Sequence, residues 1–340
     1  MKVMVTGHNG YIGSVLCEML IKEGYSVVGF DTNYYSECTL FDYKNDIEEI
    51  NKDIRDVDAN DLKEIDAIIH LAALSNDPMG ALDEKLTEDI NYRSTIKLAE
   101  TAKKVGVRRF LYSSSCSMYG VADGKALNES SPLNPVTAYA KSKVDSELSL
   151  AKIADDKFSP VYLRNSTAYG LSPKMRFDLV LNNFVGWAYT TSSIKIMSDG
   201  TPWRPLAHIR DISAAFIAAL DAPIENIHNQ AFNVGSNSEN YQIKDVAEIV
   251  KKIVPNCEIT YTNEHGSDSR TYNVNFDKIK EHMPSFKPEW NVKKGAKEIY
   301  DALRKNEVSF EEFNGDKYTR LKTLKKLMES NRIEEKLYWT

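Results

Sequence analysis

Short apolar runs alternate with amphipathic stretches through the first half of the chain. The strongest runs cover residues 2–6, 26–30, 66–72, 107–114 and 159–165. Their length and their content of β-branched residues predict strands. The run DAIIHLA at 66–72 is almost continuously apolar, as expected for a parallel strand that is covered on both faces.

Helical periodicity fills the gaps between these runs. Apolar residues recur at helical spacing from Tyr11 to Leu20, and similar stretches run from Asn91 to about Lys104 and from Tyr139 to about Asp155. Strands that alternate with helices form right-handed βαβ units. The pattern therefore predicts an α/β fold with a Rossmann-type doubly wound parallel sheet over residues 1–165.

The regular alternation of predicted strands and helices ends after residue 165. Residues 166–204 are rich in turn formers, whereas a helix at 211–221 and a strand at 230–234 return to the regular pattern. Three more helices are predicted at 241–253, 276–282 and 293–305. We expect segments near 205–235 to rejoin the first domain, and 166–204 with 236–305 to form a smaller C-terminal substrate-binding lobe.

Residues 306–340 form a charged, helical C-terminal extension. Tyr318, Leu321, Leu324 and Met328 make an apolar stripe along it. The stripe favours packing of the extension on its own lobe, and a subunit contact is the alternative.

Composition narrows the functional classes. The 340 residues are 42% hydrophobic and 27% charged, with a net charge of −6, which argues against nucleic acid or an anionic membrane as partner. No run reaches the roughly 18 apolar residues of a membrane span, and the opening MKVMVTG does not have the pattern of a signal peptide, so we expect a cytoplasmic protein. The four cysteines are scattered, which indicates neither a disulfide framework nor a metal site.

Three glycines follow the first predicted strand. Gly7, Gly10 and Gly13 have the spacing G-x-x-G-x-x-G, which differs from the G-x-G-x-x-G dinucleotide fingerprint. Glycines permit close backbone approach, and the N-terminus of a helix favours an anion. The loop is therefore either a phosphate-binding turn or an ordinary tight turn.

Asp31 stands at the end of the second strand, eighteen positions after Gly13. A carboxylate at this position accepts both ribose hydroxyls of NAD and repels the additional phosphate of NADP. A solvated turn residue is the alternative. The spacing from the glycine loop favours the NAD-binding interpretation.

Ser115, Tyr139 and Lys143 are candidates for proton transfer. Ser115 ends a predicted strand, at the edge where open α/β sheets bind ligands. Tyr139 and Lys143 lie four residues apart on one helical face. A nearby ammonium lowers the pKa of a phenol from about 10 toward the working pH.

Together these motifs resemble the NAD-dependent nucleotide-sugar epimerase/dehydratase family of the extended short-chain dehydrogenase/reductase superfamily. The matching segments occur in family order and span about residues 1–300. They are TGHNGYIG at 6–13, Asp31, Asp53-Ile54, HLAA at 70–73, Asn91, SSSCSMYG at 113–120, YAKSK at 139–143, RNSTAYG at 164–170, WRPLAHIRD at 203–211, NVG at 233–235 and SDSR at 267–270.

The resemblance implies NAD as cofactor and a nucleoside-diphosphate sugar as substrate. By resemblance, the pyrophosphate of NAD would lie on the loop with Gly7, Gly10, Tyr11, Ile12 and Gly13, its adenosine ribose on Asp31 and its adenine on Asp53 and Ile54. Leu71, Ala72 and Ala73 would line the cofactor cleft. Lys143 would bind the nicotinamide ribose and act on Tyr139, which also belongs to the cofactor site.

Arginines and asparagines supply the implied substrate site. Arg204 and Arg270 match family arginines that bind the sugar-nucleotide diphosphate, and a planar guanidinium suits phosphate oxygens; surface ion pairs are the alternative. Asn165 matches a diphosphate or sugar contact, and Asn183 a base or sugar contact. The resemblance also implies a homodimer, formed through the two helices near 88–105 and 136–157.

Cys116 and Ser117 distinguish the reactions that the family performs at C4 of the sugar. The 4,6-dehydratases carry Asp-Glu at these two positions, and the 3,5-epimerising members carry cysteine at the position of Ser117. Side chains alternate along an extended strand, so we expect Cys116 to point away as a buried apolar side chain; a thiol acting at C3 or C5 is the alternative.

Two reactions remain after this comparison, namely 4-epimerisation and 4-dehydrogenation or 4-ketoreduction. SPKMRFDLVLNN at 172–183 resembles members that act on GDP or dTDP 6-deoxyhexoses or heptoses. A 4,6-dehydratase, or a non-catalytic NAD-binding regulator, is disfavoured by the residues present.

Overall fold

A computed structural model describes residues 1–75, 83–122, 125–262 and 270–340. Its centre is a parallel sheet of seven strands in the order β10-β6-β5-β4-β1-β2-β3. These strands are β1 (Lys2–Thr6), β2 (Ser26–Asp31), β3 (Glu48–Asn51), β4 (Ala67–His70), β5 (Arg109–Ser115), β6 (Ser159–Asn165) and β10 (Gln230–Val234). The order reverses direction at β1, as in a doubly wound sheet, so the predicted Rossmann-type architecture is confirmed.

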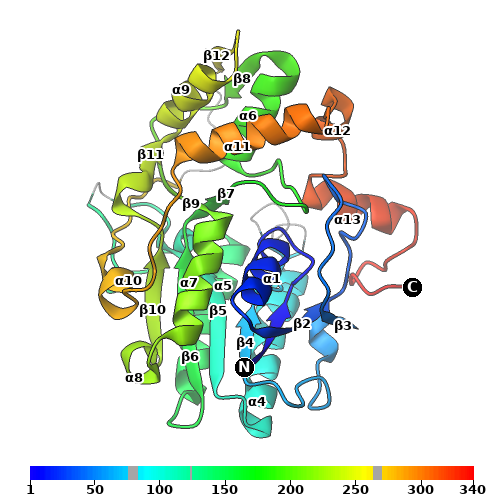
Figure 1. Ribbon diagram of the computed structural model, residues 1–340, viewed down its shortest axis with the longest axis vertical. Coiled ribbons are helices and arrows are strands. Elements are labelled where there is room, and N and C mark those ends of the chain that lie inside the picture. Colours follow the sequence, from blue (N-terminus) through cyan, green and yellow to red (C-terminus); the bar gives the residue numbers. More distant parts are fainter. Residues whose placement is uncertain (76–82, 123–124, 263–269) are drawn as a thin grey trace.

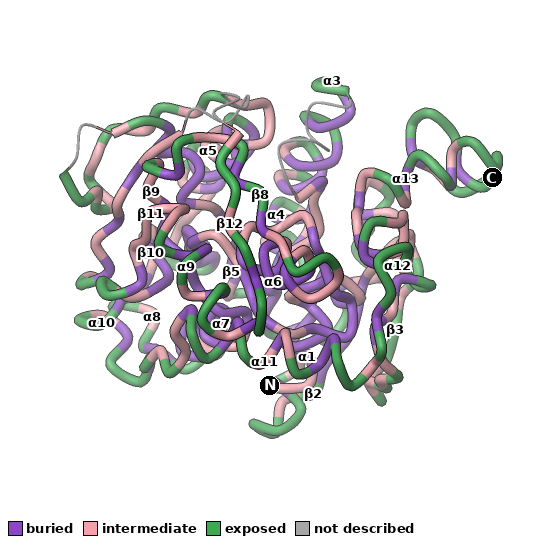
Figure 2. The backbone as a smooth tube through the Cα atoms, turned by 90° about the horizontal axis from the view of Figure 1, so that it is seen from above, coloured by how far each residue is buried: buried purple, intermediate pink, exposed green. Residues whose placement is uncertain are grey.

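Helices cover both faces of this sheet (Figure 1). One face carries α1 (Gly13–Lys22) and α7 (Ile209–Asp221), and the other carries α4 (Ser94–Val105) and α5 (Ala138–Ile153). The central strands β4, β5 and β6 are almost wholly buried, and Figure 2 shows β5 in purple at the centre of the molecule, whereas the edge strand β3 is largely exposed. The sheet thereby presents a fixed edge at the carboxyl ends of its strands.

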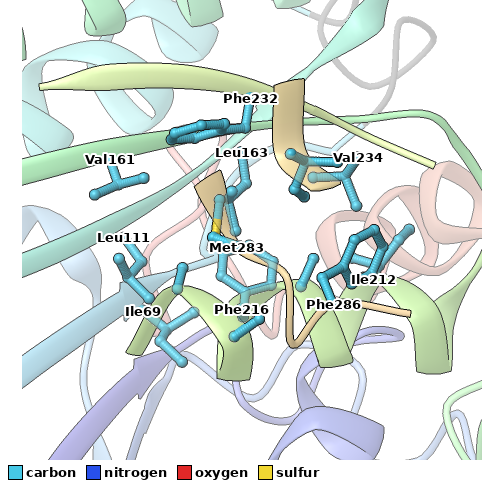
Figure 3. Packing of buried hydrophobic residues seen from close by; sticks show 14 of the residues in the cluster. Ile69, Leu111, Val161, Leu163, Ile212, Phe216, Phe232, Val234, Met283 and Phe286 are labelled. Carbon is cyan, nitrogen blue, oxygen red and sulfur yellow. The ribbon is translucent and has the colours of Figure 1, made fainter. Parts of the chain in front are cut away.

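The core on the α7 face joins distant parts of the chain. Phe216 and Ile212 of α7 pack against Leu163 of β6 and Phe232 of β10 (Figure 3). Phe286, which follows α10 (Asp277–His282), packs into the same cluster. Burial of these large side chains holds the last strand of the sheet in place.

Smaller sheets and helices lie above the carboxyl ends of the large sheet (Figure 1). The strands are β7 (Thr167–Tyr169), β8 (Ser193–Ile196), β9 (Trp203–His208), β11 (Asn240–Gln242) and β12 (Glu258–Tyr261). They form the sheets β11-β9-β7 and β12-β8. The longer helices are α6 (Val180–Thr191), α9 (Ile243–Ile253) and α11 (Val292–Lys305), whose apolar residues share one core cluster. The turn-rich appearance of 166–204 did not predict α6.

Short elements complete the chain. They are α3 (Glu84–Thr87), α8 (Ile224–Ile227), α12 (Phe310–Asn314), α13 (Arg320–Glu329), the 3₁₀ turns η1 (Ile54–Asp56), η3 (Cys116–Tyr119) and η4 (Asn237–Glu239), and the π-helical turn η2 (Glu88–Arg93). None of the helices within the described ranges is long and apolar enough to cross a membrane.

Two predictions were wrong, one about where a helix begins and one about what the C-terminal extension packs against. The helix expected to begin at Asn91 begins at Glu84, because Asp83 caps it and the π-helical turn continues it through Asn91 into α4. The C-terminal extension does not pack only on its own lobe. Leu324 of α13, and Leu337 beyond it, share a core cluster with Met4 and Phe30 of the large sheet, and α13 lies beside the loop that follows β2 (Figure 1).

Candidate active site

A cavity of about 1150 Å³ lies where the strands of the large sheet end. This volume exceeds the range of about 300–1,000 Å³ that is usual for one small ligand, so the cavity has room for two. Each residue that the sequence assigned to cofactor, catalysis or substrate lines it. They are Gly7, Gly10, Tyr11, Ile12, Gly13, Asp31, Asp53, Ile54, Leu71, Ala72, Ala73, Ser115, Tyr139, Lys143, Asn165, Asn183, Arg204 and Arg270. Residues 267–269 of the SDSR motif lie outside the described residues.

The glycine loop has the geometry of a phosphate cradle. Gly7 has a φ of +75°, and a Cβ on it would lie 2.9 Å from the backbone nitrogen of Ala72. A Cβ on Gly13 would lie 2.2 Å from the carbonyl oxygen of Gly7. Both positions therefore require glycine. In the described part of the chain no side chain caps α1, so its N-terminal amides are available to a ligand in the cavity.

Asp31 holds its carboxylate at the edge of the cavity. One oxygen accepts the backbone N–H of Asn33 at 2.9 Å, and the other accepts that of Asn9 at 3.1 Å. These bonds fix the carboxylate and leave lone pairs for further donors. A ribose diol is a donor of that kind, so the glycine cradle and Asp31 together fit NAD.

Asp53 and Ile54 lie at the same end of the cavity. Asp53 accepts hydrogen bonds from Nε of Arg55 at 2.9 Å and from its Nη2 at 2.7 Å. The guanidinium of Arg55 in turn lies 3.7 Å from the ring centre of Tyr338. This stack ties the end of the chain to the predicted adenine site.

The candidate catalytic helix α5 begins just before Tyr139. Its N-cap Thr137 accepts the backbone N–H of Ala140. One turn along, the ammonium of Lys143 donates to the carbonyl oxygen of Ser113 at 2.7 Å and lies 5.7 Å from the ring centre of Tyr139. Lys143 is 4% exposed, and this burial lowers the pKa of its ammonium to about 7.

Ser115 stands at the end of β5 and faces the same cavity. Its hydroxyl accepts the backbone N–H of Ser117 at 3.1 Å and donates to the hydroxyl of Ser117 at 2.9 Å. Cys116 is fully buried on the other side, in the core cluster of the α7 face, with its sulfur 3.1 Å from the carbonyl oxygen of Arg164. The expected burial of Cys116 is confirmed, and the same burial raises the pKa of its thiol.

A buried ion pair links α5 to strand β6. Arg164 of β6 donates from Nη2 to Glu147 at 2.7 Å, and both side chains are 7% exposed. Glu147 lies four residues after Lys143, so the pair fixes the helix that carries the candidate catalytic residues. Its role is structural, because neither side chain lines the cavity.

The predicted substrate residues stand on the side of the smaller sheets. Asn165 donates from Nδ2 to the hydroxyl of Ser113 at 3.0 Å, and its Oδ1 is buried and has no hydrogen-bond partner among the residues that the structure describes. Arg204 donates to the carbonyl oxygens of Trp203, at 2.9 Å, and of Arg270. Asn183 donates to the carbonyl oxygen of Phe177 at 2.8 Å. The unpartnered oxygen of Asn165 is an acceptor available to a ligand hydroxyl.

Sequence reasoning missed several residues that line the cavity. They are Tyr34, Tyr35, Arg176, Asp178 and Arg320. Arg176 and Asp178 fall inside the segment SPKMRFD, where an arginine close to an aspartate is a recognisable signal. Arg320 comes from the extension, and no local pattern distinguishes it from the other basic residues there.

This fold and cavity define an α/β protein that binds a dinucleotide at the carboxyl edge of its sheet. The model of the NAD dependent epimerase/dehydratase family matches residues 3–235. The chain belongs to this family, and it is therefore an NAD-dependent enzyme of the extended short-chain dehydrogenase/reductase type.

Curated relatives span nearly the whole chain. A putative UDP-glucose 4-epimerase of Methanocaldococcus jannaschii is 27% identical over 89% of this chain and 99% of its own length. The human dTDP-D-glucose 4,6-dehydratase is 24% identical over 90% of each chain. The structure of a UDP-glucuronic acid 4-epimerase from Bacillus cereus in complex with UDP-glucuronic acid and NAD is also similar, with 25% identity, a TM-score of 0.78 and coverage of 90% of this chain and 99% of that one.

Proposed function

We propose that the protein is a nucleotide-sugar 4-epimerase. The observation that carries this proposal is the pair of side chains after Ser115. Cys116 is buried in the core, and Ser117 offers a hydroxyl that bonds to Ser115. A 4,6-dehydratase must remove the proton at C5 and protonate the leaving hydroxyl at C6, and neither side chain is an acid or base suited to this at neutral pH. The similarity to the UDP-glucose 4-epimerase of Bacillus subtilis, 26% identical over 88% of this chain, supports the same reaction.

In this proposal three residues take part in proton transfer at the C4 hydroxyl of the sugar. Tyr139 accepts the proton of the C4 hydroxyl, and Ser115 donates a hydrogen bond to the same oxygen. Lys143 favours the ionised phenol through its positive charge. NAD, held by the glycine cradle and Asp31, would supply the hydride acceptor and donor for C4. A positioned base of this kind supplies a rate factor of about 10² to 10⁴.

Epimerisation requires return of the hydride to the other face of C4. The ketone that forms at C4 must therefore turn over inside the cavity before Tyr139 returns its proton. The cavity of about 1150 Å³ exceeds the volume that is usual for one small ligand, which supports a site for both cofactor and sugar. The overall reaction of such an epimerase would involve no net oxidation or reduction.

Substrate binding rests on the residues of the smaller sheets. Arg204 and Arg270, joined by a hydrogen bond between side chain and backbone, would hold the diphosphate, for which guanidinium groups are well suited. The buried, unpartnered Oδ1 of Asn165 would accept a hydroxyl of the sugar. Asn183 would contact the base or the sugar.

A panel of UDP, dTDP and GDP sugars, incubated in deuterated water and followed by NMR, tests the proposal. A product inverted at C4, with no carbon-bound deuterium from solvent, supports a 4-epimerase. Accumulation of a keto sugar with reduced cofactor would instead identify a 4-dehydrogenase or 4-ketoreductase. Deuterium at C3 or C5 would overturn the assignment to C4 alone, and the absence of binding by every sugar would contradict an enzyme that acts on nucleotide sugars.

We also infer that two copies of the chain pair through α4 and α5. Leu148 on α5 is 57% exposed, and Val105 at the end of α4 is 39% exposed. Large apolar side chains that face water on adjacent helices are typical of a contact surface.

A further inference from the structure

An arginine from the C-terminal extension enters the cavity. Arg320 is the first residue of α13, is 2% exposed and lines the cavity. Its Nη2 donates to the carbonyl oxygen of Lys174 at 2.9 Å, and its guanidinium lies 4.1 Å from the ring centre of Tyr35. Its Nη1 is buried and has no hydrogen-bond partner in the described part of the chain.

Positive charge exceeds negative charge around Arg320. Within the described ranges, Lys174, which is buried, donates hydrogen bonds only to uncharged oxygens of Tyr35, Ser36 and Thr39. Arg176 is also buried, and it forms the two parallel bonds of a bidentate pair with Asp178, at 2.9 and 2.8 Å.

Three cations therefore share one carboxylate among the described residues of this cluster. Burial, and then the charge of Arg176, lower the pKa of Arg320, and burial followed by the charge of Arg320 lowers the pKa of Lys174. Buried charge without a partner is strongly unfavourable. The binding of an anionic ligand would compensate this positive charge, which stays uncompensated when the site is empty.

The position of the cluster indicates which anion it serves. Ser172 donates to the carbonyl oxygen of Tyr11 at 2.8 Å and contacts the hydroxyl of Ser14 at 3.1 Å. The segment that carries Lys174 and Arg176 therefore lies against the N-terminal turn of α1. This turn follows the glycine cradle, where a pyrophosphate would bind. Arg204, by contrast, lies on β9 of the β11-β9-β7 sheet and donates to the carbonyl oxygen of Arg270.

We propose that Arg320 binds the pyrophosphate of NAD, so that the C-terminal extension completes the cofactor site. The glycine cradle and the N-terminus of α1 bind the pyrophosphate on one side, and Arg320 binds it on the other. This assignment depends on NAD binding and not on the reaction at C4.

The extension is fixed firmly enough for this task. Its carbonyl oxygens at Leu337 and Lys336 accept hydrogen bonds from Tyr34 and Arg55, and the indole N–H of Trp339 donates to the carbonyl oxygen of Thr32 at 2.6 Å. These contacts lie next to Asp31 and Asp53. The extension is thus bonded to the same two segments that are predicted to hold the adenosine.

Ligand binding to the full-length Arg320→Met variant, after removal of copurified NAD, tests the proposal. Calorimetry would measure the affinities for NAD, ADP, adenosine and UDP. Because a hydrogen bond to a charged group is removed, we expect the affinities for NAD and ADP to fall about ten- to a hundredfold. Adenosine has no phosphate, and UDP reports the substrate site, so both should bind as they do to wild type.

Thermal unfolding without ligand provides the second measurement. Arg320→Met removes a buried charge that has too few partners, so the NAD-free variant should unfold at or above the temperature of wild type. Arg332→Met is the matched control, because Arg332 lies on the same extension and is exposed in a surface ion pair with Glu37. The control should bind all four ligands as wild type does.

Several results would overturn the proposal. A variant Arg320→Met that fails to fold, or that unfolds at a clearly lower temperature, would show that Arg320 is a structural residue. Unchanged affinity for ADP would exclude contact with the cofactor pyrophosphate. Loss of affinity for UDP in place of ADP would assign the arginine to the substrate diphosphate. None of these results depends on the 4-epimerase assignment, since no turnover is measured.

Discussion

Replacing Lys143 by methionine should stabilise the NAD-free protein near neutral pH. The ammonium of Lys143 is enclosed between β5 and α5, and burial lowers its pKa from 10.5 to about 7. The carboxylate of Glu147, whose charge acts to raise this pKa, is already bound by Arg164. The folded protein therefore carries this charge with little compensation, as is common for groups retained for catalysis.

The sign of the pH dependence follows from proton binding. Between pH 7 and 10.5 the unfolded chain keeps the proton on Lys143, whereas the folded chain releases it. The free energy of unfolding then rises with pH, by at most about 1.4 kcal/mol per unit. Below pH 7 the side chain is protonated in both states, and the buried ammonium destabilises the folded protein by its full amount. This destabilisation is about 4 kcal/mol at pH 7 and about 2 kcal/mol at pH 9.

Urea unfolding at pH 7, 8 and 9 measures this effect. We expect Lys143→Met to exceed wild type in stability by an amount that shrinks by about 2 kcal/mol from pH 7 to pH 9. Taking the difference between the two proteins removes the contribution of other titrating groups. Lys141→Met is the control, because Lys141 is exposed on the same helix. A difference that stays constant with pH would refute the claim that burial holds the pKa of Lys143 low.

Other substitutions test separate parts of the structure. Cys116→Ala should leave turnover within a few-fold of wild type, because the thiol is buried outside the cavity; a loss of activity with normal folding would contradict this. Arg164→Met should lower the free energy of unfolding by about 3–5 kcal/mol, since it leaves Glu147 buried and unpaired, and adding Glu147→Gln should restore part of it in urea unfolding. Leu148→Glu should convert a dimer to a monomer in light scattering, and an unchanged mass would contradict the inferred interface.

Local patterns were sufficient to predict the sheet and much of the candidate site. The glycine loop is a short-range feature, since Gly7 and Gly13 must pack within a few ångströms of neighbouring backbone. The pairing of Tyr139 with Lys143 needs only one helical turn. Residues that end parallel strands, such as Asp31 and Ser115, reach the same edge of the sheet because of the topology. These inferences needed no knowledge of long-range packing.

Long-range packing explains what could not be predicted. Arg176 and Arg320 enter one cavity from positions 144 residues apart, and no periodicity links them. The apolar stripe of the extension identifies a buried face but not the surface that covers it, so its contact with Met4 and Phe30 was not foreseen. α6 was missed because polar residues before and after it resemble a loop.

Transfer of a C4-deuterium label tests the proposed reaction most directly. A sugar nucleotide that the enzyme accepts would be prepared with deuterium at C4 and incubated with the enzyme in ordinary water. The product is then examined by NMR. A 4-epimerase should give a product inverted at C4 that retains the deuterium there, and Tyr139→Phe should slow its formation by about 10² to 10⁴. An inverted product that has lost the C4 deuterium to solvent would contradict the account.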